Sequence, residues 1–411
     1  MNVFDPLTLP NGSTIKNRIA KAAMEENMAD ADQAPSAELM RLYQAWADGG
    51  AGLIITGNVM VDRRALTGPG TIALEAGSPL APFEAWARAA RAHGAQAWMQ
   101  ISHPGRQVMA NMGGLAWAPS AVALDLGKHS KMFAQPVAMT EADIADVIER
   151  FAATAHAAER AGFTGVQIHA AHGYLLSQFL SPLANRRDDD WGGSLARRAR
   201  LLLEVVRAVR ARVAPGFCVG VKLNSADFQR GGFSEDDARQ VLAMLNAERV
   251  DLVELSGGSY ESPAMQGRTA DGRTLAREAY FLEFARDLAQ VASMPLMTTG
   301  GIARRKIAEE ALHSGVAIVG IATALAAVPD LPRAWQAGHE PVAAMPAVGW
   351  KDKALVSLAR MALVRRRLHA LAAGAGALTA YSPVVTLVLD QLRGARLTRR
   401  YRAWLRAVAS T

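Results

Sequence analysis

Short apolar runs alternate with longer amphipathic segments along most of the chain. The short runs are rich in β-branched and apolar residues, as buried strands are: Ile19–Met24, Gly52–Thr56, Ala95–Ile101, Gly165–Ala170, Phe217–Leu223, Asp251–Ser256, Pro295–Thr299 and Val316–Ile321. The segments between them space their apolar residues as helices do: Ser36–Gly49, Pro79–His93, Thr140–Ala161, Ser194–Val213, Ser234–Ala247, Leu275–Ala292 and Ala303–Ser314. This alternation predicts an α/β protein with a parallel sheet and helices outside it.

The number of strands favours one particular parallel fold. Eight candidate strands over about 340 residues match a closed (β/α)8 TIM barrel with loop insertions. An open doubly wound sheet is the alternative, but no Gly-x-Gly-x-x-Gly turn follows the first strand. Two long connections, residues 102–139 and 256–274, follow strand carboxyl ends, which is where such a barrel places its active site.

The pattern changes from Trp350 onward, so we predict a barrel over residues 1–344 and an amphipathic helical extension over 345–411. Apolar residues at helical spacing mark a first helix: Met361, Val364, Leu368 and Leu371. A second helix is predicted from about Pro383 to Leu392, followed by the basic, aromatic segment RLTRRYRAWLRAV. We expect the extension to pack on the barrel or on a sister subunit, in a homo-oligomer. A membrane-surface or nucleic-acid role is the alternative.

Charge is concentrated in that extension. The chain of 411 residues is 50% hydrophobic, which excludes a disordered or collagen-like protein, and its formal net charge is +7. Residues 345–411 hold 12 basic and 2 acidic residues, whereas the other 344 residues hold 33 and 36. The basic character therefore gives no reason to expect nucleic-acid binding by the barrel. The single cysteine, Cys218, excludes an internal disulfide framework and a cysteine-based metal or iron–sulfur site.

One stretch is long enough to test for membrane insertion. Ala370–Leu389 has 20 residues without a charge, but it is rich in Ala and Gly and contains Pro383, so we expect no membrane span. The N-terminal sequence MNVFDPLTLPNGSTIKNR lacks the basic and then apolar pattern of a signal peptide, so a cytoplasmic location is expected.

Candidate chemistry gathers after the fourth predicted strand, where His169, His172 and Tyr174 occur in IHAAHGYLL. The two histidines can be a metal pair, although no third ligand is near in sequence. They can equally be packed, hydrogen-bonded core residues. They can also donate hydrogen bonds to a carbonyl or nitro oxygen, with Tyr174 as a general acid.

Several motifs, in order, resemble the old yellow enzyme family of FMN-dependent oxidoreductases from about Phe4 to Trp335. They are FDPLTLPNGSTIKNRIAKAAM, GLIITGNVMVD, QISHPGRQ, IHAAHGYLLSQFLSPLANRRDDDWGGS, VKLNSADF, TTGGI and VGIATALAAVPDLP. The resemblance implies a (β/α)8 barrel that binds FMN and takes hydride from NADPH or NADH. It also implies reduction of an activated C=C bond in a small electron-poor alkene or carbonyl compound, with ping-pong kinetics.

The resemblance implies roles for residues in these motifs. His169 and His172 match the pair that binds the electron-withdrawing group of the substrate, and Tyr174 matches the proton donor. Gln100 matches the amide that hydrogen-bonds the flavin pyrimidine, and Lys222 the cation near flavin N1 and O2. The remaining matches are wall and phosphate positions: Ala22, Ala23 and Met24 along the isoalloxazine, Asn58 with its backbone toward the flavin, and Gly300, Gly301, Ala322 and Thr323 at the phosphate.

The chain departs from the family pattern at three places. Glu25 replaces the usual Thr or Cys beside the flavin, and we hypothesise that it lowers the flavin potential or contacts substrate. Thr323 replaces the usual phosphate-binding arginine, for which Arg304 or Arg305 is a possible substitute. Glu26–Met28 lacks the aromatic residue that some relatives have there.

The alternatives to a flavin oxidoreductase belong to two other classes. One is a metal-dependent TIM-barrel hydrolase that uses His169 and His172 as ligands. The other is a non-catalytic barrel with a membrane-surface-binding tail. The hydrolase should be a colourless protein with bound metal, and the non-catalytic barrel should bind liposomes in a salt-dependent way and show no turnover.

Overall fold

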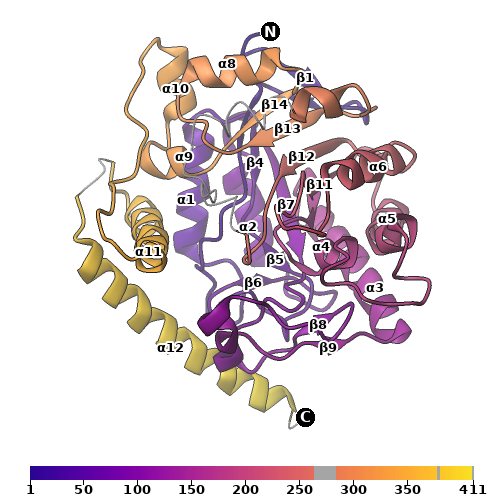
Figure 1. Ribbon diagram of the computed structural model, residues 1–411. Coiled ribbons are helices and arrows are strands. Elements are labelled where there is room, and N and C mark those ends of the chain that lie inside the picture. The colour runs from indigo at the N-terminus through magenta and orange to yellow at the C-terminus, as the bar shows by residue number, and fades with distance from the viewer. Residues whose placement is uncertain (263–283, 377–379, 410–411) are drawn as a thin grey trace.

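Eight parallel strands form a closed barrel in the computed structural model, which describes residues 1–262, 284–376 and 380–409. In chain order they are β3 (Ile19–Lys21), β4 (Leu53–Ile55), β7 (Gln96–Ser102), β10 (Gly165–Ala170), β11 (Cys218–Asn224), β12 (Leu252–Ser256), β13 (Leu296–Thr299) and β14 (Ile318–Ile321). Each pairs in parallel with the next, and β14 pairs with β3 to close the ring. The predicted TIM barrel is confirmed (Figure 1).

Helices surround the barrel close to their predicted positions. They are α1 (Ala37–Asp48), α2 (Ala81–Ala90), α3 (Glu141–Arg160), α5 (Leu195–Arg212), α6 (Glu235–Leu245) and α8 (Arg305–His313). Polar caps explain several starts: the Ser36 side chain caps α1, and Thr140 and Ser234 form capping boxes with Asp143 and Asp237. Of the predicted helix Leu275–Ala292, residues 284–289 are helical, while 275–283 lie outside the described residues.

The barrel interior has an apolar layer at its amino-terminal end. Buried side chains from six of the eight strands fill it: Leu53, Trp98, Cys218, Leu252, Met297 and Ile318. Two glycines make room for the largest of these, since a Cβ at Gly165 or at Gly220 would lie 2.8 Å from the Trp98 ring system. The interior is therefore a packed core, and any ligand must bind above this layer.

Short strands, 3-10 turns and short helices lie around the barrel. The two-residue strands β5 (Val59–Met60) and β6 (Ile72–Ala73) extend the sheet beside β7. The long connection 102–139 forms the 3-10 turns η2 (Ala110–Met112) and η3 (Gly127–Met132), and the paired strands β8 (Trp117–Ala118) and β9 (Val137–Ala138). Three short helices complete the set: α4 (Leu175–Leu180), α9 (Thr323–Ala327) and α10 (Leu331–Gln336).

The C-terminal extension forms two helices, α11 (Lys353–Ala372) and α12 (Pro383–Ala409). The predicted end near Leu392 was wrong, because α12 continues to Ala409 as it runs along the outside of the protein (Figure 1). Packing supports the extra turns: Tyr401 is 4% exposed and its hydroxyl donates to the Arg63 carbonyl.

Helix α11 lies between α12 and α1. Its fully buried Arg367 donates to the carbonyls of Ala326 and Ala327 at the end of α9. The extension therefore packs on the barrel within one chain. No helix in the described part of the chain is long and apolar enough to cross a membrane.

Candidate active site

Three aromatic rings meet at the carboxyl end of β10. The His169 ring is 4.8 Å from the Tyr174 ring and 5.1 Å from the His172 ring, with near-perpendicular planes. His169 is the last residue but one of the strand, while His172 and Tyr174 come from the turn that leads into α4. The fold thus brings together the three residues that the sequence motif singled out.

The turn that presents His172 is held in an unusual backbone conformation. His172 has φ 60° and Gly173 has φ 73°, both in the left-handed region. A Cβ at Gly173 would approach Gln107 Oε1 to 2.9 Å, so glycine is needed there. The Asn224 side chain accepts the His172 N–H at 3.1 Å, and Gln107 Nε2 donates to the His172 carbonyl at 3.1 Å. These contacts support a strained turn of the kind found at functional sites.

Both histidines are neutral at ordinary pH. Burial lowers the pKa of His169 and His172 well below the usual value, and the Lys222 charge lowers both further. His169 Nδ1 accepts the Ala171 N–H at 3.2 Å, so the neutral ring carries its proton on Nε2. His169 therefore offers one N–H donor. His172 Nε2 lies 2.7 Å from the Ser256 hydroxyl, a positioning contact that sequence reasoning missed.

A second tyrosine, also missed from the sequence, joins the first. Tyr260 follows β12, and its hydroxyl oxygen lies 3.2 Å from that of Tyr174. Phe133, from the long connection, packs 5.9 Å from the Tyr260 ring. The only signal in the sequence was the position of residues 256–274 after a barrel strand. Residues 263–274 of that connection lie outside the described residues.

A buried polar network forms the layer of the barrel beneath these rings. Lys222 Nζ pairs with Glu254 Oε1 at 2.9 Å, and both side chains are buried. The same carboxylate accepts hydrogen bonds from Thr299 and Gln167, each at 2.7 Å. Gln100 Nε2 in turn donates to Gln167 Oε1 at 2.7 Å. The predicted residues Gln100 and Lys222 are thus linked, through partners that sequence reasoning missed.

The segments that follow β3 and β4 form one wall of the candidate site. Ala22 is buried inside the barrel, while Ala23 and Met24 are partly buried at its edge. A Cβ at Gly57 would collide with the Met24 carbonyl and with Glu26, so the two segments touch there. Asn58, the next residue, is 9% exposed, and its amide lies 3.4 Å from the Thr67 hydroxyl.

Glu25, half-buried, belongs to the same wall. Its Oε1 accepts hydrogen bonds from Thr67 at 2.6 Å and from Thr71 at 3.3 Å. Burial raises the pKa of Tyr174 and of Tyr260, and the Glu25 carboxylate raises both further. Glu25 is therefore part of the electrostatic environment of the two phenols.

The predicted phosphate positions lie at the carboxyl ends of β13 and β14. Gly300 and Gly301 are exposed with φ 134° and 70°, Ala322 precedes α9, and Thr323 is exposed at its first residue. These paired turns offer the backbone N–H donors that a phosphate needs. Of the two proposed substitutes for an arginine, Arg305 pairs with Glu309 at 2.8 Å and Arg304 is exposed. With Gln100 and Lys222, the donor set fits FMN.

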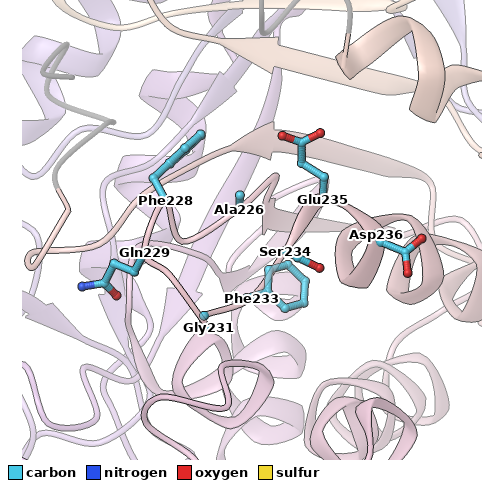
Figure 2. A pocket seen from close by; sticks show the side chains of 9 residues that line it. Ala226, Phe228, Gln229, Gly231, Phe233, Ser234, Glu235 and Asp236 are labelled. Atoms are coloured by element: carbon cyan, nitrogen blue, oxygen red, sulfur yellow. The ribbon is translucent and has the colours of Figure 1, made fainter. Parts of the chain in front are cut away.

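A hollow of about 500 Å³ lies beside this site, between the end of β11 and the start of α6. Figure 2 shows its lining, which includes Phe228, Phe233 and Glu235. None of His169, His172 and Tyr174 lines it. In the described ranges, no three His, Cys, Asp or Glu side chains are grouped to hold a metal ion.

Comparison with known proteins supports a flavin chemistry. A model of the NADH:flavin oxidoreductase / NADH oxidase family matches residues 2–341. The NADH-dependent flavin oxidoreductase iliE of Hypocrea jecorina is 37% identical over 357 residues, which cover 82% of this chain and 89% of that one. NadA of Aspergillus parasiticus, also an NADH-dependent flavin oxidoreductase, is 41% identical, covering 69% and 67%. Among solved structures, an old yellow enzyme homologue from Zymomonas mobilis aligns with TM-score 0.71 and 26% identity, covering 85% and 95%.

Proposed function

Because this chain belongs to the NADH:flavin oxidoreductase / NADH oxidase family, we propose that it reduces an activated C=C bond, in an enone, enal or similar electron-poor alkene. The proposed reductant is NADH or NADPH, and the proposed kinetics are ping-pong. The observation that carries the proposal is the cluster of His169, His172 and Tyr174, in which two neutral imidazoles adjoin a phenol. This cluster can bind a carbonyl oxygen and deliver a proton nearby.

When bound, FMN would supply the hydride-transfer chemistry between the nicotinamide and the acceptor. Gln100 and Lys222 would hold its ring system, and Gly300, Gly301, Ala322 and Thr323 its phosphate. Lys222 has three N–H donors, and among the described residues only the pair with Glu254 uses one, so two donors are open to an acceptor such as the flavin.

The chain's own residues act on the substrate. The His169 Nε2–H donates to the substrate's carbonyl oxygen, which makes the β-carbon more electrophilic. His172 supports the same oxygen through Nδ1 when Ser256 donates its hydroxyl proton to Nε2. Tyr174 then protonates the α-carbon from its hydroxyl. A neutral histidine pair suits this role, because it binds the oxygen without competing for the proton.

We make a separate proposal for each of two residues, Glu25 and Thr323, at which the chain differs from the family pattern. We propose that Glu25 contacts substrate or lowers the flavin potential, which its proximity to both tyrosines supports. Replacing Glu25 with Thr should change the substrate profile or the potential. We also propose that Thr323 leaves the phosphate without a charged partner. Thr323→Arg should then tighten FMN binding, measured by fluorescence titration of the apoprotein, and an unchanged dissociation constant would contradict this.

The first test is a visible absorption spectrum of the purified, desalted protein under anaerobic conditions. We expect a yellow protein that bleaches with NADH or NADPH and regains its colour with cyclohexenone. A colourless protein that stays inert after FMN is added would contradict the proposal. It would favour the metal-dependent hydrolase or the non-catalytic barrel, which metal analysis and salt-dependent liposome binding would distinguish.

A further inference from the structure

The loop after β12 connects the buried proton donor to a more exposed phenol. Tyr174 is 7% exposed, whereas Tyr260 is partly exposed, and their hydroxyl oxygens are 3.2 Å apart. A phenolic hydroxyl both donates and accepts, so the pair can pass a proton along a single hydrogen bond. We propose that Tyr260 is a positioning residue that returns a proton to Tyr174 after each turnover. This inference rests on the proposed C=C reduction.

The loop holds Tyr260 in place on both sides. The next residue, Glu261, pairs with Arg106 at 2.7 Å, and the two side chains are only 10% and 7% exposed. Glu261 Oε1 also accepts the Asp125 N–H at 2.8 Å. The preceding Ser259 hydroxyl accepts the Glu261 N–H at 3.2 Å. Because a buried charged pair tolerates little displacement, it fixes the Tyr260 backbone relative to the 102–139 connection.

The ring of Tyr260 is also packed. It lies 6.1 Å from the Tyr174 ring at 72°, and 5.9 Å from Phe133 at 58°. Substitution of Tyr260 with Phe should therefore remove the hydroxyl and leave both ring contacts. The hydroxyl can be tested separately from the packing.

The geometry of the pair agrees with this direction of transfer. Burial raises the pKa of both phenols. When Tyr174 has lost its proton, its phenolate oxygen accepts the hydrogen bond of the Tyr260 hydroxyl and can take that proton. Tyr260 is the more exposed of the two phenols, so it is the one that recovers a proton from solvent.

The steps balance with one proton taken from solvent per turnover, the proton that the reduction of a C=C bond by a hydride donor consumes. As the new C–H bond forms at the α-carbon, the Tyr174 O–H bond breaks, and the negative charge of the substrate enolate passes to the Tyr174 oxygen. The Tyr260 O–H then breaks as the Tyr174 O–H re-forms. Solvent water finally returns a proton to the Tyr260 oxygen.

The test compares the two half-reactions of Tyr260→Phe in an anaerobic stopped-flow experiment. We expect reoxidation by cyclohexenone to slow about tenfold to a hundredfold, because the Tyr174 phenolate that forms as the α-carbon is protonated loses its hydrogen bond from Tyr260. Reduction by NADH and reoxidation by ferricyanide should keep wild-type rates, because neither puts a proton on carbon. A structural role alone would change all three rates together.

Tyr401→Phe is the matched control. It removes a hydroxyl that donates to the Arg63 carbonyl where α12 packs on the barrel, so all three rates should stay at the wild-type level. Glu261→Gln is a second variant that keeps Tyr260 but weakens its anchor on Arg106. It should slow only the cyclohexenone step, by less than Tyr260→Phe.

A second readout needs no flavin. In apoprotein labelled with ¹³Cζ-tyrosine, the Tyr174 signal, assigned with Tyr174→Phe, should move in Tyr260→Phe and stay in Tyr401→Phe. An unmoved signal, or equal slowing of both half-reactions, would overturn the inference. A wild-type protein that bleaches with NADH but is not reoxidised by any enone would overturn the proposed function instead, before any variant is compared.

Discussion

Two buried lysine–glutamate pairs lie about the same barrel, one outside its strands and one inside. Lys21 follows Ala20 and precedes Ala22, both of which point into the barrel, so its own side chain points outward toward α1. There it pairs with Glu26 at 3.1 Å. Lys222 points into the barrel and pairs with Glu254 at 2.9 Å.

The two pairs differ in how many of the three lysine N–H donors have a partner among the described residues. Lys21 uses all three, on Glu26, on the Tyr43 hydroxyl at 3.2 Å and on the Ile55 carbonyl at 3.0 Å. Its ammonium also lies 4.5 Å from the Trp46 ring centroid. Among the described residues, Lys222 has one acidic partner, Glu254, and it lies beneath the histidine and tyrosine rings, where its charge lowers the pKa of the histidines.

Burial of a charge therefore does not by itself mark a functional residue. We call Lys21–Glu26 the closed pair, because all three lysine donors have partners, and Lys222–Glu254 the open pair. The closed pair joins β3 to α1 and to the loop after β4, because Tyr43 also accepts the Gly57 N–H at 2.8 Å. The open pair presents a cation at the mouth of the barrel. The difference predicts that variants of the Lys21–Glu26 pair affect the stability of the fold. Variants of the Lys222–Glu254 pair should instead affect ligand binding and chemistry.

The largest expected effect is on folding. Lys21→Met leaves the Glu26 carboxylate buried without its cation, which should lower the free energy of unfolding by about 3–5 kcal/mol. Equilibrium urea denaturation of the apoprotein measures this. Adding Glu26→Gln should restore part of the loss, because the uncompensated charge is then gone. If Lys21→Met were as stable as wild type, the closed pair would not have the structural role described here.

The corresponding change in the open pair should act on the cofactor. Lys222→Met should weaken FMN binding about tenfold to a hundredfold, because a charge-assisted hydrogen bond is lost. Fluorescence titration of the apoprotein with FMN measures this, and Glu254 keeps its bonds from Gln167 and Thr299. An unchanged affinity for FMN would mean that Lys222, like Lys21, has a structural role.

The same variant should also change the histidine titration. Burial and the Lys222 charge both lower the pKa of His172, so Lys222→Met should raise it, as seen by NMR of the imidazole signals. A folded pKa below the unfolded one means that stability falls as pH drops below about 6.5, and this loss should be smaller in the variant. Lys21→Met, whose charge is not among the causes of the His172 shift, is the control.

A smaller effect is expected from the acid of the open pair. Glu254→Gln leaves the Lys222 charge uncompensated, which favours negative charge on the reduced flavin. The two-electron midpoint potential of bound FMN should rise by about 30 mV, the equivalent of ~1.4 kcal/mol. A spectroelectrochemical titration measures this, and a constant or lower potential would show that Glu254 does not moderate the Lys222 charge.

The smallest effect is expected at the edge of the closed pair. Tyr43→Phe removes one acceptor for Lys21 and for the Gly57 N–H, which should lower the free energy of unfolding by about 1 kcal/mol. The FMN potential should stay at its wild-type value. A shift in potential would mean that the two pairs are coupled across β3.

Much of the barrel and part of the candidate site followed from local patterns. Apolar runs between amphipathic segments predicted the strands, and the motif around His169 and Tyr174 identified residues that do lie together. Glu254 was missed, although its strand has polar residues at alternate positions 254 and 256. Tyr260 was missed because its partner is 86 residues away and the loop between strands has no periodic signal. The continuation of α12 was missed because its last turns are basic in composition, whereas the burial of Tyr401 against the barrel is a tertiary contact.

The amino-acid sequence by itself determined the strand and helix order, the family motifs and the residue types available for chemistry. Those properties depend on local conformational preference and on hydrophobic periodicity, which act over a few turns of chain. Tertiary structure alone decided which lysine has partners for all three of its donors, and which phenol lies beside Tyr174. Barrel closure brings Lys222, Glu254 and Thr299 from three strands to one layer. A hydrogen bond depends on distances of a few tenths of an ångström, so partners distant in sequence are set only by the folded chain.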